Sequence, residues 1–113
     1  MPPAVAILNP KRPDDPFPFK HLCGCGVGFK FMQAFAKNNN IPFSRLIPLL
    51  DFCAVSIAAD IVPVVDENRI LAFHGLKLLN TNPSIGLKAI IDICGLNGRE
   101  LSMSDIVFKL GPR

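Results

Sequence analysis

The chain has 113 residues, with 12 basic and 9 acidic side chains, and therefore a formal net charge of +3. This length supports one compact unit, and a hydrophobic content of 50% excludes a disordered chain. The mild charge, without any run of basic residues, excludes a purely electrostatic nucleic-acid binder.

The first predicted element is a short strand at residues 4–8, a continuous apolar run typical of strands buried in parallel sheets. Residues 9–20 contain four prolines, which exclude a helix and predict a long irregular loop. A Gly-x-Gly-x-Gly pattern at residues 24–28 then precedes a helix that should end within residues 38–40. This pattern fits either close packing at a helix start or a phosphate cradle, although its spacing matches no dinucleotide-binding or P-loop fingerprint.

Ser44 is a candidate cap for a central, buried helix that runs to about Ala59. Further helices are predicted at residues 66–79, 84–94 and 102–110. The count is about five helices and one strand, and one strand cannot form a sheet. We therefore expect a chain that is mainly α on its own, either a helical bundle with an extended arm or a piece of an α/β domain.

Asp60 is the polar side chain that most needs an explanation, because it lies in the otherwise apolar residues 57–65. This context predicts burial, and a buried carboxylate is costly unless it is paired, hydrogen-bonded or bound to metal. The end of a helix adds to the cost, since the helix dipole disfavours negative charge there. A divalent metal, a basic partner such as Arg69, or backbone N–H groups of the next turn could compensate the charge.

The other polar residues show no catalytic arrangement in their spacing. Asp51 precedes Asp60 by nine residues and so lies on the opposite face of the predicted helix, which excludes a general acid–base pair. His21 and His74 are isolated and are interpreted as structural. The basic pair Lys11-Arg12 in the proline-rich loop is either solvated or in contact with phosphate. No interleaving of aromatic and basic residues indicates a stacking platform for single strands.

The most apolar stretch is interrupted by Asp51 and Asp60, so no membrane-spanning helix is predicted. The first residues lack the pattern of a secretion signal. The four cysteines do not have the spacing of a zinc site, and the apolar content makes a disulfide scaffold unnecessary. We therefore expect reduced thiols, a cytoplasmic location and no membrane contact.

Six segments stand in an order typical of one protein family, namely residues 9–13, 16–24, 26–30, 50–63, 67–69 and 108–113. Together they resemble the RecJ-like, single-stranded-DNA-specific exonucleases of the DHH phosphoesterase superfamily. Residues 50–63 resemble the fourth motif of that superfamily, and the closing Gly-Pro-Arg resembles the segment that leads into the family's next domain. The resemblance covers almost the whole chain.

The resemblance implies a metal-dependent phosphodiesterase that degrades single-stranded DNA from its 5′ end in recombination and repair. In such enzymes Mn²⁺ or Mg²⁺ activates water and stabilises charge at phosphorus. By position, Asp60 matches an aspartate ligand of the fourth motif. Lys11, Arg12 and Arg113 are candidate contacts to the phosphates of the DNA.

By the same resemblance, residues 1–80 correspond to the C-terminal part of the DHH catalytic domain, and residues 81–113 to connecting helices. The family's earlier motifs, an Asp-x-Asp cluster and an Asp-His-His triplet, do not occur in this sequence, and Ser56-Ile57 replaces the Gly-Thr of many relatives. One aspartate cannot hold a catalytic metal pair. We therefore expect a fragment with no complete catalytic site, no bound metal and no nuclease activity alone. Unpaired strand edges and apolar faces predict a homo-oligomer.

The sequence leaves two other functions open. A stand-alone, non-catalytic helical interaction module accounts for the apolar helices, but it leaves Asp60, the proline-rich loop and the lone strand unexplained. Another DHH phosphoesterase would act on short oligonucleotides or cyclic dinucleotides. The proline-rich loop and the closing Gly-Pro-Arg favour the exonuclease over this second alternative.

Overall fold

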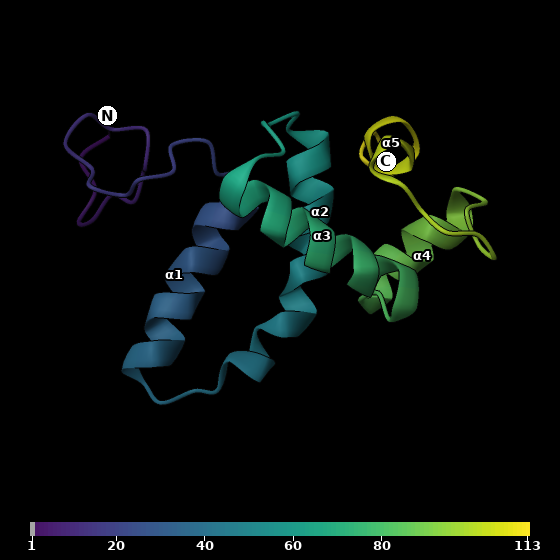
Figure 1. The fold of residues 1–113 in the computed structure, drawn as a ribbon, viewed down its shortest axis with the longest axis horizontal. Helices are drawn as coiled ribbons and strands as arrows, with labels where there is room; N and C mark the ends of the chain where they lie inside the picture. Colours follow the sequence, from purple (N-terminus) through teal and green to yellow (C-terminus); the bar gives the residue numbers. More distant parts are fainter. Residues whose placement is uncertain (1) are drawn as a thin grey trace.

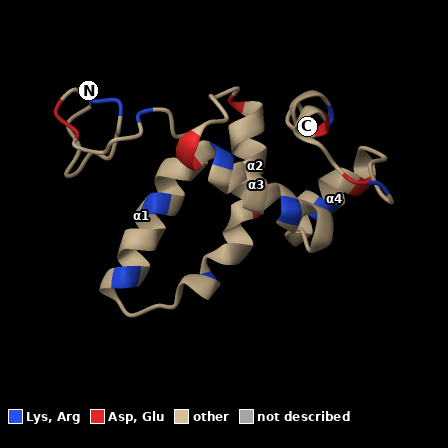
Figure 2. Ribbon diagram, in the orientation of Figure 1, with Lys and Arg blue, Asp and Glu red and all other residues tan. Residues whose placement is uncertain are grey.

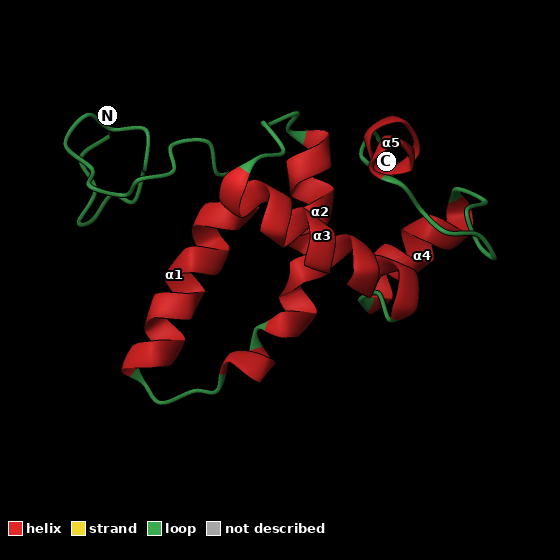
Figure 3. Cartoon of the chain, viewed as in Figure 1, coloured by secondary structure: helices red, strands yellow, loops and turns green. Residues whose placement is uncertain are grey.

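The computed structural model describes residues 2–113, and its regular elements are all helical (Figure 3). After a long proline-rich loop come the helices α1 (Gly24–Asn38), α2 (Leu50–Ala59), α3 (Asp66–Thr81), α4 (Ile85–Ile93) and the single turn α5 (Met103–Asp105). Two short 3₁₀ turns, η1 (Phe43–Arg45) and η2 (Ile47–Leu49), precede α2, and a π turn, η3 (Ile106–Leu110), follows α5. The expectation of a mainly α chain with five helices is confirmed.

In Figure 1, α1 and α2 form two legs that are joined by residues 39–49, and α3 lies across α2. Helices α4 and α5 lie on the side of α3 away from α1. Helices α2 and α3 make the most extensive contact in the fold. Their close approach depends on Gly75, because a Cβ at this position would lie 2.1 Å from the backbone oxygen of Leu50. The helix pair α2–α3 is therefore the centre on which the other elements pack.

Two clusters of buried side chains lie against this helix pair. The first is formed by α1, α2, the first half of α3 and the end of the proline-rich loop, with Phe19, Phe29, Cys53, Ile57 and Leu71 among its members. The second is formed by the ends of α2 and α3 together with α4, α5 and η3, and it includes Ala58, Leu79, Leu87, Ile91 and Ile106. Met103 packs against both clusters. Burial of these apolar side chains is the main favourable term for the fold.

Helix α1 begins at Gly24, so the glycine pattern lies inside its first turns. Cys23 is the N-cap, and its Sγ accepts a hydrogen bond from the Gly26 N–H at 3.3 Å. A Cβ on Gly26 would lie 3.2 Å from Cδ2 of Leu22, which favours the close-packing interpretation at this position. The helix ends as predicted, with the Asn39 N–H bonded to the carbonyl oxygens of Phe35 and Ala36.

Two predicted elements differ from the structure. Residues 4–8 form no strand and are exposed, because the part of the chain described contains no other strand to pair with them. The helix expected from Ser44 begins only at Leu50. Pro48 lies in η2, and its missing N–H and fixed ring prevent a continuous helix through residues 44–49. Phe52 of α2 is also exposed, so that helix is not buried on every side.

The C-terminal helices lie where the sequence predicts them. Ser84 is the N-cap residue of α4, although its hydroxyl makes no capping hydrogen bond. Ser102 and Asp105 form a reciprocal capping box around α5, in which Ser102 Oγ accepts from the Asp105 N–H at 3.2 Å. The division of the chain after residue 80 stays a prediction. Within residues 2–113, every helix is too short or too polar to cross a membrane.

Candidate metal and nucleic-acid sites

Asp60 is the C-cap residue of α2 and is exposed, so the prediction that it is buried is wrong. The loop that follows α2 is not covered by another element, and Ile61 beside it is 81% exposed. Asp60 Oδ2 accepts a hydrogen bond from the Ser56 hydroxyl at 3.0 Å. Asp60 forms no ion pair with Arg69 or with any other residue that the structure describes. Solvent and the Ser56 hydroxyl therefore compensate its charge.

The loop after Asp60 has an unusual backbone and a buried anchor. Ile61 adopts a φ of +51°, which is rare for a β-branched residue. Asn68, in the first turn of α3, is fully buried and donates from Nδ2 to the carbonyl oxygens of Pro63 at 3.0 Å and His21 at 2.7 Å. These bonds fasten the loop after Asp60 to the segment that enters α1. Sequence reasoning missed Asn68, since it fitted the polar start of a helix equally well.

The residues present do not complete a metal centre. Within residues 2–113, no group of three or more His, Cys, Asp or Glu side chains is placed to hold a metal ion. Asp60 supplies one accessible carboxylate, whereas divalent cations bound by oxygen take several ligands. The donor set on this chain therefore fits one ligand of a centre, and it does not fit a whole centre.

The three candidate phosphate contacts are not brought together. Arg12 is paired with Asp14, and this carboxylate raises the pKa of the Arg12 guanidinium, while Arg12 lowers the pKa of Asp14. Lys11 is exposed, and its backbone N–H donates to Asn9 Oδ1. Arg113 is exposed at the other end of the chain. Figure 1 places the two ends on opposite sides of α2 and α3, and Figure 2 shows the charged positions spread over the helices.

The cysteines are all free, and they differ in their surroundings. Cys25 is exposed, while Cys23 and Cys53 are buried. Burial, followed by the proximity of Cys23, Cys25 and Asp51, raises the pKa of the Cys53 thiol to about 12. Cys53 therefore acts as a small apolar core residue, in keeping with the reduced thiols expected from the sequence.

Comparison with known proteins gives close relatives of one kind. The chain is 36% identical over 123 residues to the single-stranded-DNA-specific exonuclease RecJ of Escherichia coli, and it is 38% identical over 113 residues to the RecJ of Bacillus subtilis. The RecJ of Haemophilus influenzae is 36% identical over 121 residues. Each match covers 100% of this chain, but it covers only 21%, 14% and 21% of these relatives, respectively.

No family model matches the chain, and no solved structure does. The matches over the whole chain place it among exonuclease sequences that are named for single-stranded DNA. The chain belongs to the RecJ family, as the motifs in its sequence indicated, and it spans about a fifth or less of the length of the curated relatives it matches.

Proposed function

We propose that the chain is part of a metal-dependent exonuclease that degrades single-stranded DNA from the 5′ end in recombination and repair. The observation that supports this most directly is the alignment of the whole chain with five RecJ proteins at 34–38% identity. The order of the motifs along the sequence agrees with this alignment. On this proposal the protein works in the cytoplasm.

In this proposal Asp60 is one ligand of a site for Mn²⁺ or Mg²⁺, and the other ligands come from outside residues 2–113. Such an ion, when bound, activates water and stabilises negative charge at phosphorus. The exposed carboxylate at the end of α2 and the anchoring of its loop by Asn68 are consistent with this role. The 113-residue chain alone has no complete site and is inactive.

The parent domain is proposed to be an α/β domain of the DHH type. Residues 1–80 would be its C-terminal part, and residues 81–113 would be helices that connect to a further domain. The exposed apolar residues 4–8 support this view, because they have the composition of a buried strand and no partner in the described chain. Strands from elsewhere in the parent protein would pair with them.

The test is hydrolysis of 5′-labelled single-stranded DNA in the presence of Mn²⁺. The 113-residue chain should be inactive, whereas a RecJ-length protein that contains it should release nucleotides. Asp60→Asn in the longer protein should abolish hydrolysis, while Asp92→Asn, an exposed carboxylate of α4, should leave it unchanged. An active short chain, or an active Asp60→Asn variant, would contradict the proposal. Preference for cyclic dinucleotides or very short oligonucleotides would instead identify another DHH phosphoesterase.

Exposed apolar side chains on α1 favour a second proposal, that the isolated chain associates with itself or with a helical partner. Met32 and Phe35 are 39% and 47% exposed, respectively. Such a surface favours association in water. Sedimentation velocity should therefore detect a dimer or a larger species, and a strictly monomeric profile would count against self-association.

A further inference from the structure

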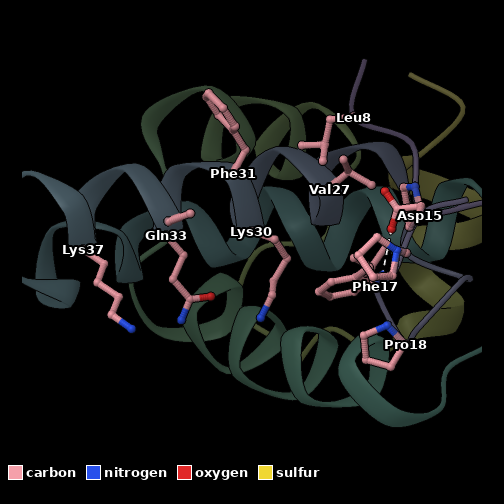
Figure 4. A pocket seen from close by; sticks show the side chains of 13 residues that line it. Leu8, Asp15, Phe17, Pro18, Val27, Lys30, Phe31, Gln33 and Lys37 are labelled. Atoms are coloured by element: carbon pink, nitrogen blue, oxygen red, sulfur yellow. Dashed lines mark hydrogen bonds between the residues drawn. The ribbon is translucent and has the colours of Figure 1, made fainter. Parts of the chain in front are cut away.

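An apolar groove with a volume of about 730 Å³ lies between α1 and the proline-rich loop (Figure 4). We call it the α1 groove. Val27, Phe31 and Ala34 line it from α1, Pro10 and Phe17 line it from the proline-rich loop, and Leu8 lines it from the segment before that loop. The two walls come from separate parts of the sequence, so the groove exists only in the folded chain.

The aromatic side chains of the α1 groove are accessible. Phe31 is 58% exposed, and Phe17 is partly buried, with the Lys30 ammonium 5.9 Å from the centre of its ring. Aromatic faces that stand beside cationic side chains are the usual means by which proteins bind unpaired bases, because every base can stack on them. A duplex keeps its bases stacked inside, so the α1 groove suits a single strand.

One edge of the α1 groove carries polar side chains. Lys30, Gln33 and Lys37 point to the same side of α1 in Figure 4, as their spacing along a helix requires. Seven residues of helix place the two lysines about 10 Å apart along the axis. Lys37 has no ion pair with any residue in 2–113, whereas Lys30 contacts Glu67 at 3.5 Å.

Asp15 is the acidic residue of the α1 groove, and its carboxylate already has a hydrogen bond and an ion pair within the chain. Its Oδ1 accepts from the Phe17 N–H at 2.8 Å and lies 4.0 Å from Lys20 Nζ. Two lysines and one aspartate give the lining side chains a net charge of +1, and because Glu67 lies 3.5 Å from Lys30, Lys37 is the lysine of the lining without an ion pair in residues 2–113. The edge formed by Lys30 and Lys37 is thus the part of the α1 groove that complements a phosphate chain.

We infer that the α1 groove binds single-stranded DNA, with bases against Phe17 and Phe31 and phosphates along the edge formed by Lys30 and Lys37. The substrate class rests on the proposed function, and the location rests on the groove. The sequence alone indicated no stacking platform, because the fold supplies one ring from the loop and the other from α1. None of Lys11, Arg12 and Arg113 lines the α1 groove.

Fluorescence anisotropy tests the inference, with the 113-residue chain and a labelled oligothymidylate of about ten nucleotides. Lys37→Glu should weaken binding by about tenfold and make the slope of log K against log salt shallower by about 0.7, the value for one phosphate contact on a single strand. Phe31→Ala should weaken binding by about fivefold or more. Lys88→Glu and Phe73→Ala, exposed positions outside the α1 groove, are the matched controls.

Melting temperatures of all variants show whether each one is folded. The inference is overturned if the unsubstituted chain binds no single-stranded DNA, or if it binds DNA and the Lys37 and Phe31 variants bind equally well. It is also overturned if these variants lower the melting temperature of a RecJ-length protein without changing its DNA affinity, because the groove would then contact polypeptide. The nuclease assay gives its result independently of these binding measurements. A failure of the proposed function can therefore be told apart from a failure of the α1 groove to bind DNA.

Discussion

The carboxylate of Asp51 accepts a hydrogen bond from the backbone N–H of Ser84, with 2.7 Å between Oδ2 and the nitrogen. Asp51 lies in the first turn of α2 and is fully buried, and Ser84 is the N-cap residue of α4. The other carboxylate oxygen accepts from the Phe52 N–H at 2.7 Å. Negative charge is favourable near a helix N-terminus, so one side chain stabilises the starts of two helices.

Replacement of Asp51 by alanine should therefore destabilise the chain. The substitution leaves the Ser84 and Phe52 N–H groups without their acceptor, and an unsatisfied buried donor costs about 1–3 kcal/mol. Urea denaturation should show a free energy of unfolding lower by about 2–4 kcal/mol. Asp92→Ala, in the exposed part of α4, should change it by less than about 0.5 kcal/mol. Equal stability of the two variants would show that the Asp51 bonds are dispensable.

Gly75→Ala should separate α2 from α3. The new methyl group would lie 2.1 Å from the Leu50 oxygen and 2.8 Å from Cβ of Ala54, so one helix must move. Overpacking of this kind costs about 1–3 kcal/mol, which thermal unfolding would detect. Gly28→Ala is the control, because nothing lies within 4 Å of a Cβ there and alanine should stabilise α1 by about 0.5–1 kcal/mol. The prediction fails if both substitutions stabilise the chain.

The capping box at α5 predicts a loss of stability in acid. The hydrogen bond from the Ser102 N–H, together with bonds from Lys109, the Ser102 hydroxyl and Arg99, holds the pKa of Asp105 well below its usual range. Its contribution to stability is therefore present above the unfolded pKa of about 3.9 and is lost as pH falls from there through the folded pKa.

Thermal unfolding midpoints measured between neutral pH and pH 2 would check this prediction. Asp105→Asn should lower stability at neutral pH and should flatten the dependence on pH below about 4. Asp92→Asn should leave that dependence unchanged, since Asp92 is exposed. If the stability of the Asp105→Asn variant falls in acid as much as that of the original chain, the loss of stability does not arise from Asp105.

The thiols should differ in their reaction with iodoacetamide. Cys25 is exposed, whereas Cys53 is buried and has its pKa raised to about 12. Only about one Cys53 thiol in ten thousand would be ionised at pH 8, and the thiolate is the reactive form. Mass spectrometry should therefore find Cys25 modified first and Cys53 modified only after urea is added. Rapid modification of Cys53 in the folded chain would contradict its burial.

Most helices could be predicted from the sequence, because apolar periodicity and end signals are local properties. The asparagines after α1, the acidic start of α3 and Ser102 at α5 each fix a boundary within a few residues. The composition of residues 4–8 predicts a strand, but strand formation requires a partner, and the described chain holds none. The pattern of residues within a segment does not show whether a second strand is available to pair with it.

The candidate site was less predictable for a related reason. An apolar neighbourhood in the sequence predicted burial of Asp60, yet burial depends on what covers a loop in three dimensions, and nothing in residues 2–113 covers it. Asn68 and Asp51 owe their importance to backbone groups far away in the sequence, at His21 and Ser84. The α1 groove combines Phe17 and Phe31 in the same way. Contacts between distant segments leave little trace in a single sequence.

Helices α2 and α3 contribute to both core clusters, so neither cluster is complete without this helix pair. A cut after residue 80 would uncover Ala58 and Leu79, and it would leave Leu87 and Ile91 with only the cluster members of residues 96–110 to pack against. Amide protons of the helix pair should therefore exchange with solvent together and slowest, through opening of both clusters at once. The shared helix pair makes folding of the two halves a single cooperative event.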